Sequence, residues 1–254
     1  MDQHPPAGQR VAFFGGSFDP PHQGHLAVAR AARTALALDT VLFAPVGAQP
    51  LKPHGSTASF EDRVEMTRLA VEGTPDFEVS LIDAPKPFAA PNYTLETLLH
   101  LRAELGPGGA LFCLMGADSF LGLRRWHRST EIPFVAPLIV ASRPGQPLDD
   151  LRAALPHGLK MEDAPAPPTQ AIAADAFRVH PFLLRNAVGD SAPFYLLAGL
   201  HVEISASQIR DLIRGGIRAG IGQESQGDSE FRLSRQQLLP VPVLDYILSH
   251  KLYR

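Results

Sequence analysis

Residues 11–25 read VAFFGGSFDPPHQGH, and this stretch decides the fold expected for the rest of the chain. The apolar run at 11–14 ends in two glycines, which is typical of a buried strand that enters a tight turn. After the turn, residues 25–38 read HLAVARAARTALAL and are rich in strong helix formers. Residues 40–45 have the composition of a second strand. The stretch and its continuation therefore predict a β-α-β unit.

The alternation of strands and helices continues along the chain. A helix is expected directly after Ser59, whose hydroxyl suits the N-cap position. A second helix is expected at 94–105, with Thr94 as its N-cap. Further strands are expected at the apolar segments 77–82, 110–115 and 137–142. Strands that alternate with helices predict an α/β fold, a doubly wound Rossmann-like parallel sheet with helices on both faces.

The domain organisation follows from where this pattern is interrupted. Residues 1–10 are polar and contain prolines, so we expect a flexible N-terminal arm before a domain that spans 11–254. The pattern weakens between 146 and 200, where the Pro- and Ala-rich segment 163–176 predicts an insertion or excursion. No chemistry is assigned to it. A final helix is expected at 241–252.

Composition narrows the class of protein. The 254 residues are 45% apolar and 19% charged, as in a folded globular protein. The formal charge of −3 argues against a nucleic-acid-binding surface. Cys113 is the only cysteine, which excludes an internal disulfide and a cysteine zinc site. The sequence has no signal-peptide pattern and no apolar run of the roughly 18 residues that cross a membrane, so we expect a cytoplasmic protein.

The loop at 15–25 is suited to bind an anion. Gly15 and Gly16 let the backbone approach a phosphate, while the N–H groups and the positive dipole end of the next helix attract negative charge. His22 and His25 are three residues apart at the helix entrance, so both imidazoles can point into one pocket. The loop therefore predicts a phosphate site with two histidine donors.

Asp19 and the two prolines after it have a structural interpretation. An Asx turn and fixed φ values would shape the loop without contact to a ligand.

Two other segments suit nucleotide binding. In ISASQIR at 204–210, Ser205 suits the N-cap of a helix and Arg210 follows one turn later, a combination that holds phosphate oxygens, although an ordinary cap with a solvated Arg is the alternative. Asp118 follows a strand end, where a carboxylate can accept hydrogen bonds from ribose hydroxyls or else cap a helix.

Trp126 and Lys52 are candidates for contacts with a second substrate. Trp126 is the only tryptophan and lies among charged residues, which suits stacking on an aromatic ring, although a partly buried structural role is the alternative. Lys52 follows the second strand and could reach a phosphate or remain solvated.

The segment HQGH at 22–25 resembles the (T/H)xGH signature of the nucleotidylyltransferase superfamily. The longer segment GGSFDPPHQGH resembles the nicotinate mononucleotide adenylyltransferase family. The same resemblance includes, in the expected order, RVEMTRLA at 63–70, NYTLETL at 92–98, MGADSFLGLRRWHR at 115–128, ASRPG at 141–145, ISASQIR at 204–210 and VPVLDYILSHKLY at 241–253. The chain departs from the family pattern at Ala206, where a second Ser is usual, and before Lys52, where paired prolines are usual.

The resemblance implies an enzyme that transfers AMP from ATP to nicotinic acid mononucleotide, giving deamido-NAD and pyrophosphate. It implies His22 and His25 as catalytic residues. The implied ATP-binding residues are Gly15, Gly16, Ser17, Phe18, Asp118, Arg143, Ser205, Ile209 and Arg210, and the implied acceptor-binding residues are Lys52, Tyr93, Thr94 and Trp126. Mg²⁺ is expected to arrive with ATP, held mainly by phosphates and water and not by protein ligands.

Other functions stay open. A sister nucleotidylyltransferase would use another acceptor, such as nicotinamide mononucleotide or phosphopantetheine, or a cytidylyl donor. A non-catalytic nucleotide sensor would bind ATP without turnover, with residues 146–200 available to a protein partner. A dinucleotide-dependent dehydrogenase is disfavoured because GGSFDPPH lacks the GxGxxG spacing. The sequence leaves open the choice between nicotinate and nicotinamide acceptors, and also the oligomeric state, a homo-oligomer included.

Overall fold

The computed structural model describes residues 8–51, 55–142, 145, 147–164, 177–200, 205–218 and 238–254. Within this part of the chain, the strands form one eight-stranded sheet in the order β3-β2-β1-β4-β5-β8-β7-β6. Strands β1 to β5 and β8 are mutually parallel, and β7 and β6 add two antiparallel strands at one edge. The strands are β1 (Arg10–Gly16), β2 (Thr40–Pro45), β3 (Phe77–Val79), β4 (Ala110–Gly116), β5 (Leu138–Ala141), β6 (Lys160–Asp163), β7 (Arg178–Arg185) and β8 (Ser191–Ala198).

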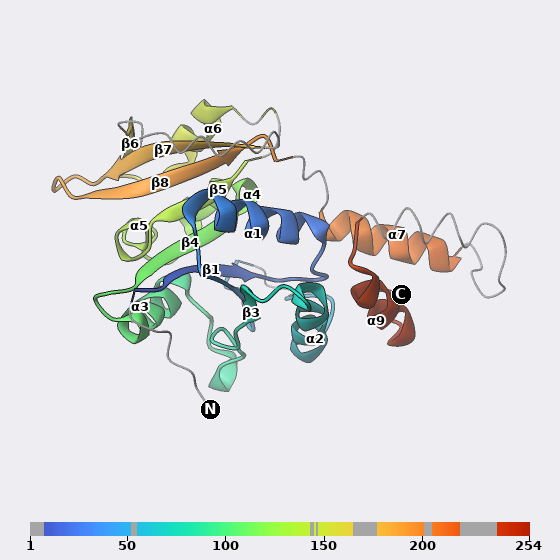
Figure 1. Cartoon of the computed structure of the whole chain (residues 1–254). Coiled ribbons are helices and arrows are strands. Elements are labelled where there is room, and N and C mark those ends of the chain that lie inside the picture. The colour runs from blue at the N-terminus through green and yellow to red at the C-terminus, as the bar shows by residue number, and fades with distance from the viewer. Residues whose placement is uncertain are drawn as a thin grey trace.

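Helices cover both faces of the sheet (Figure 1). One face packs against α1 (Gln23–Leu36), α2 (Phe60–Val71), α7 (Ala206–Arg218) and α9 (Val241–Ser249), and the other against α3 (Thr94–Leu105), α4 (Ala117–Leu121), α5 (Ile132–Val135) and α6 (Leu148–Ala154). Two short 3-10 helices are η1 (Pro87–Ala89) and η2 (Leu123–Arg125). The side chains of β1 alternate between the two cores, since Phe14 packs with the α1 layer and Phe13 with the α3 layer. The predicted doubly wound fold is confirmed.

The helix starts show which capping predictions hold. Ser59 Oγ accepts a hydrogen bond from Asp62 N at 3.0 Å, so the predicted N-cap of α2 is confirmed. The predicted cap of α3 was wrong by one residue. The carbonyl of Tyr93 accepts the hydrogen bond from Thr97 N, which makes Tyr93 the N-cap and Thr94 the first helical residue.

Residues 147–164 and 177–200 contain structure that the sequence analysis did not assign. Strand β8 lies beside β5 and runs parallel to it, so this segment continues the central sheet. Strands β7 and β8 form an antiparallel pair across the turn at residues 186–190. Arg10, which the sequence analysis placed in a flexible arm, is the first residue of β1.

The strand order places a crevice at the centre of the sheet. The chain proceeds from β1 through β2 to β3 on one side and then returns to place β4 on the other side of β1. Ligands of such sheets bind outside the carboxyl ends of the strands at this point of reversal. Gly16 ends β1 there, and Gly116 ends β4. None of the helices in the described part of the chain is long and apolar enough to cross a membrane.

Candidate active site

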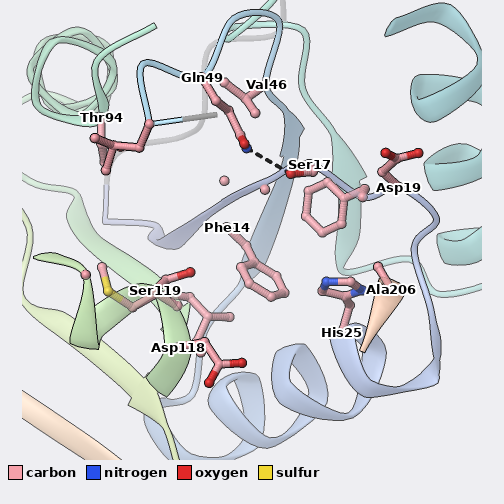
Figure 2. A pocket seen from close by; sticks show the side chains of 18 of the residues that line it. Phe14, Ser17, Asp19, His25, Val46, Gln49, Thr94, Asp118, Ser119 and Ala206 are labelled. Atoms are coloured by element: carbon pink, nitrogen blue, oxygen red, sulfur yellow. Dashed lines mark hydrogen bonds between the residues drawn. The ribbon is translucent and has the colours of Figure 1, made fainter. Parts of the chain in front are cut away.

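A cavity of about 940 Å³ opens at the carboxyl ends of β1 and β4. The predicted site residues that line it are Gly15, Gly16, Ser17, Phe18, His22, His25, Tyr93, Thr94, Asp118, Trp126, Ser205 and Arg210. Figure 2 shows His25, Asp118 and Thr94 reaching the same hollow from three different helices. The side chain of Ile209 packs in the core and does not line the cavity. Lys52 and Arg143 lie outside the described residues.

The two histidines lie in contact at the entrance to α1. Their ring centroids are 3.7 Å apart and the rings are inclined by 32°. His22 is the N-cap of α1, and its backbone N–H donates to His25 Nδ1 at 3.2 Å. Because an accepting ring nitrogen carries no proton, neutral His25 holds its hydrogen on Nε2. The ring of Phe18 packs against His25 at a centroid distance of 5.0 Å and limits its rotation.

Burial keeps both imidazoles neutral. It lowers the pKa of His22 from 6.5 to about 4. Burial, and next the neighbouring His22, hold the pKa of His25 well below its usual value. Nδ1 of His22 is buried and has no hydrogen-bond partner in the described part of the chain. This atom faces the start of α1, where the His22 side chain lies against the N3 backbone in a capping-box arrangement.

Side chains at the two glycines that end β1 would press against the rings of Phe13 and Phe18. A Cβ on Gly15 would lie 2.7 Å from the ring of Phe13, and one on Gly16 would lie 3.2 Å from the ring of Phe18. The backbone therefore forms the wall of the cavity at this point, as expected for a loop that a phosphate approaches closely.

Arg63 holds this loop from behind. Its side chain is 2% exposed, and its Nη1 donates to Ser17 O at 2.7 Å while its Nη2 donates to Val46 O at 2.9 Å. One guanidinium thus links the segment after β1 to the segment after β2. Burial lowers the pKa of Arg63, an effect that nearby Asp19 opposes. Arg63 begins the RVEMTRLA segment, but nothing in its local sequence predicts this contact with the phosphate loop.

Ser205 and Arg210, the second group predicted to bind phosphate, also line the cavity. Ser205 Oγ accepts from Gln208 N at 3.3 Å, and Gln208 Oε1 accepts from Ser205 N at 3.1 Å, which confirms the predicted N-cap of α7. Arg210 Nη1 donates to Asp19 O at 2.6 Å. The start of α7 is therefore attached to the loop that contains the histidines.

The opposite wall of the cavity is aromatic and polar. The rings of Tyr93 and His127 lie 4.4 Å apart, and half-buried Trp126, the residue before His127, also lines the cavity. Asn92 Oδ1 accepts from Ala48 N at 3.0 Å, so it joins this wall to the segment after β2. The rings of Tyr93 and His127 already contact each other, so an aromatic ligand would stack against this wall and not between these two rings.

Some functional candidates were missed by sequence reasoning. Buried Asp83 accepts a hydrogen bond from Thr97 Oγ1 at 2.6 Å, and burial raises its pKa. Gln49 Nε2 donates to Ser17 Oγ at 2.9 Å and so joins two loops over the cavity (Figure 2). Asn92 and His127 belong to NYTLETL at 92–98 and MGADSFLGLRRWHR at 115–128, two segments that the family resemblance includes. Gln49 and Asp83 lie outside the segments of that resemblance.

The donor set of the cavity suits an anion. Backbone N–H groups, two neutral imidazoles and a guanidinium converge on its phosphate-loop side. Within the described ranges, no three His, Cys, Asp or Glu side chains are grouped as metal ligands would be. The arrangement can hold two phosphorylated molecules and stabilise negative charge between them.

Comparison with known proteins places the chain in a family. The family model described as cytidylyltransferase-like matches residues 13–212. A protein of Geobacter metallireducens named probable nicotinate-nucleotide adenylyltransferase is 34% identical over 244 residues, which cover 96% of this chain and 98% of the relative. A protein of Dechloromonas aromatica with the same name is 37% identical over 246 residues, which cover 96% and 97%.

A solved structure has the same fold. Plasmodium falciparum nicotinic acid mononucleotide adenylyltransferase complexed with NaAD matches with a TM-score of 0.63 over 96% of this chain and 97% of that chain, at 14% identity. Because a third or more of the residues are identical to those of relatives over nearly the whole length, this chain belongs to the cytidylyltransferase-like family and, within it, to the nicotinate-nucleotide adenylyltransferases.

Proposed function

We propose that the protein transfers AMP from ATP to nicotinic acid mononucleotide and releases pyrophosphate. The observation that carries this proposal is the neutral pair His22 and His25, which lies at the point of strand reversal in a cavity with aromatic rings on its far wall. The names of the relatives support the same reaction. Deamido-NAD is then the product, and the enzyme acts in NAD biosynthesis.

The reaction is an in-line displacement at phosphorus. An oxygen of the acceptor phosphate forms a bond to the α-phosphorus of ATP, the bond from that phosphorus to the bridging oxygen breaks, and its electron pair leaves with pyrophosphate. The acceptor phosphate is ionised near neutral pH, so the step needs no general base. The protein contributes by positioning the two substrates and by stabilising charge.

The two histidines supply donors for the developing charge. His25 Nε2–H is directed to the cavity because its Nδ1 is engaged by His22 N. A hydrogen bond to the α-phosphate shortens and strengthens as charge builds on the transferring group. His22 lies in contact with His25 and supplies the second imidazole. Because both rings are neutral without ligand, they do not repel each other in the empty site.

The remaining assignments follow the position of each group around the cavity. We assign the backbone of residues 15–18 to the triphosphate, Ser205 and Arg210 to its β and γ phosphates, and Asp118 to a ribose. Ile209 contributes to ATP binding by packing in the core and so holding α7 in place. Arg143 stays a predicted ATP contact.

The aromatic wall is assigned to the acceptor. Trp126 and the Tyr93-Thr94 pair surround the space where a pyridine ring would lie, and Lys52 stays a predicted phosphate contact. ATP enters as its magnesium complex, with the ion held by phosphates and water, since Mg²⁺ loses its water reluctantly. We place the reaction in the cytoplasm. We propose that the nucleotidyltransferase domain spans 11–254 and that residues 146–200 are an excursion from it whose strand β8 returns to the central sheet.

The test is a steady-state assay with Mg²⁺ and ATP that follows pyrophosphate release with three acceptors. Nicotinic acid mononucleotide should give the highest kcat/KM, above nicotinamide mononucleotide and phosphopantetheine. A preference for either of the other two would replace the acceptor in this proposal. ATP binding without turnover on any acceptor would instead favour a nucleotide sensor.

A further inference from the structure

Asp19 belongs to the phosphate loop, lines the cavity and is 4% exposed. Its Oδ2 accepts from Thr57 N at 2.6 Å, and its Oδ1 accepts from Ala58 N at 3.1 Å and from Tyr253 Oη at 2.8 Å. These donors come from the segment before α2 and from the residues after α9. One buried carboxylate therefore joins three parts of the chain that are far apart in sequence.

Tyr253 is placed as a dedicated donor to this carboxylate. Its side chain is buried with the α9 core, and burial, followed by the charge of Asp19, raises its pKa, so the phenol keeps its proton. Hydrogen bonds to an ionised acceptor are about twice as strong as those between neutral groups. Loss of one donor would leave Asp19 less well satisfied in a buried place.

Asp19 also contacts Arg210, the positively charged side chain expected at the triphosphate. Arg210 Nη1 donates to Asp19 O at 2.6 Å and lies 4.0 Å from Asp19 Oδ2. The side chain of Arg210 is 22% exposed, at the border of the cavity. In the described part of the chain, the buried guanidinium of Arg63 also interacts with this carboxylate. The direction in which Arg210 presents its remaining N–H groups thus depends on where Asp19 is held.

We propose that Asp19 and Tyr253 are positioning residues that orient Arg210 and the phosphate loop towards the triphosphate of ATP. This inference rests on the proposed function. Neither residue is assigned a contact with the acceptor, whose proposed wall lies across the cavity. Weakening the hydrogen bonds that hold the Asp19 carboxylate should therefore reduce affinity for ATP and leave affinity for the acceptor unchanged.

The chain offers a matched control. Tyr246 lies on α9, and its Oη donates to Asp62 Oδ1 on α2 at 3.0 Å. Y246F and Y253F each remove one phenol–carboxylate hydrogen bond made by the C-terminal part of the chain, but Tyr246 bonds to α2, which packs beside α9 (Figure 1), whereas Tyr253 bonds to the phosphate loop. Only Y253F alters the phosphate loop.

The experiment measures Mg·ATP and nicotinic acid mononucleotide binding separately by calorimetry, and KM for each, in the full chain and in Y253F, Y246F and D19N. Y253F should raise the Kd for ATP by up to roughly tenfold, the effect expected when Arg210, displaced with Asp19, loses one hydrogen bond to phosphate. Its Kd for the mononucleotide should stay at the wild-type value, and Y246F should bind both as wild type. D19N, which keeps the shape of Asp19, should weaken ATP binding in the same way.

Equal ATP affinity in Y253F, D19N and Y246F would overturn the inference. So would a parallel loss of affinity for both substrates in Y253F, because that is the mark of a general structural role. Should Y253F not fold, D19N decides by the same criteria. A wild-type protein that binds neither substrate would refute the proposed function itself, whereas a wild-type protein with full turnover and an unaffected Y253F would refute only the role of Tyr253.

Discussion

The backbone N–H of His22 donates to Nδ1 of His25, and the two rings lie 3.7 Å apart. The start of α1 thus sets the tautomer of the second histidine as well as its orientation. No second side chain is needed to direct Nε2–H into the cavity. The arrangement presents two neutral donors to an anion at the end of β1, where helix dipole and backbone N–H groups already attract negative charge.

Replacement of His25 by Ala should reduce kcat by roughly two to three orders of magnitude, as loss of a transition-state donor does in other enzymes. Stability should be retained, because Phe14 and Phe18 still fill the core around the site. The measurement is kcat by pyrophosphate release, with thermal unfolding as the check on folding. H100A, which changes an exposed histidine on α3, is the control and should keep wild-type kinetics. Wild-type kcat in H25A would contradict the assignment.

The buried histidines should make stability dependent on pH. His22 has an ordinary pKa of 6.5 when unfolded and about 4 when folded, so between these values the unfolded chain binds more protons. The free energy of unfolding therefore falls as pH falls from 7 to 4, by up to about 3 kcal/mol for this residue. In urea unfolding at pH 7 and pH 5, the free energy of unfolding of H22N should change less between the two pH values than that of the wild type. If the free energy of unfolding changed equally with pH in H22N and in the wild type, His22 would not be buried as a neutral ring.

Removal of the Arg210 guanidinium should act on ATP. R210A should raise the KM for ATP roughly tenfold or more, the loss of charge-assisted hydrogen bonds to phosphate. The control is R214A on the same helix, where Arg214 pairs with Asp211 at 2.7 Å on the surface and does not line the cavity. R214A should keep the wild-type KM. An unchanged KM for ATP in R210A would exclude Arg210 from the triphosphate site.

Truncation of Trp126 should act on the acceptor. W126A should raise the KM for nicotinic acid mononucleotide roughly tenfold, since stacking on an aromatic ring is lost, and should leave the KM for ATP unchanged. Phe88 is fully exposed in η1 and does not line the cavity, so F88A is the control for loss of an aromatic ring. A larger effect of W126A on ATP than on the mononucleotide would reverse the proposed placement of the two substrates.

Substitutions at Gly47, in the segment after β2, and at Gly116, which lines the cavity, should separate an effect on stability from an effect on ligand binding. A Cβ on Gly47 would lie 2.5 Å from Pro85 N, whereas a Cβ on Gly116 would meet no atom within 4 Å. G47A should therefore lower the midpoint of thermal unfolding, and G116A should leave it unchanged while it weakens substrate binding. Differential scanning calorimetry with and without ATP checks both. A stable G47A would show that the segment after β2 can move away from Pro85.

Strands β1, β2, β4 and β5 of the parallel core were predictable because each is a run of mainly apolar residues. Both faces of β1 and β4 are covered, so their residues do not alternate and are recognised from composition alone. Strands β7 and β8 were missed for the opposite reason. They contain Pro181 and Pro193, which normally exclude a central strand, and they are half exposed.

The phosphate side of the site was also predictable, since Gly15, Gly16, His22 and His25 are close in sequence. The support behind it was not. Asp19 meets Arg210 and Tyr253 across separations of 191 and 234 residues, and Arg63 reaches two carbonyls that only the folded sheet brings together. Such contacts leave no periodic pattern in the sequence. Asp19 was expected to shape its loop, and the structure adds that it does so by binding three distant segments.

The most direct test is a crystal structure with a non-hydrolysable ATP analogue and nicotinic acid mononucleotide bound together. We expect the α-phosphate within hydrogen-bond distance of His25 Nε2, with the triphosphate along residues 15–18 and the pyridine ring against Trp126. A triphosphate bound elsewhere, with the two imidazoles untouched, would contradict the proposed chemistry.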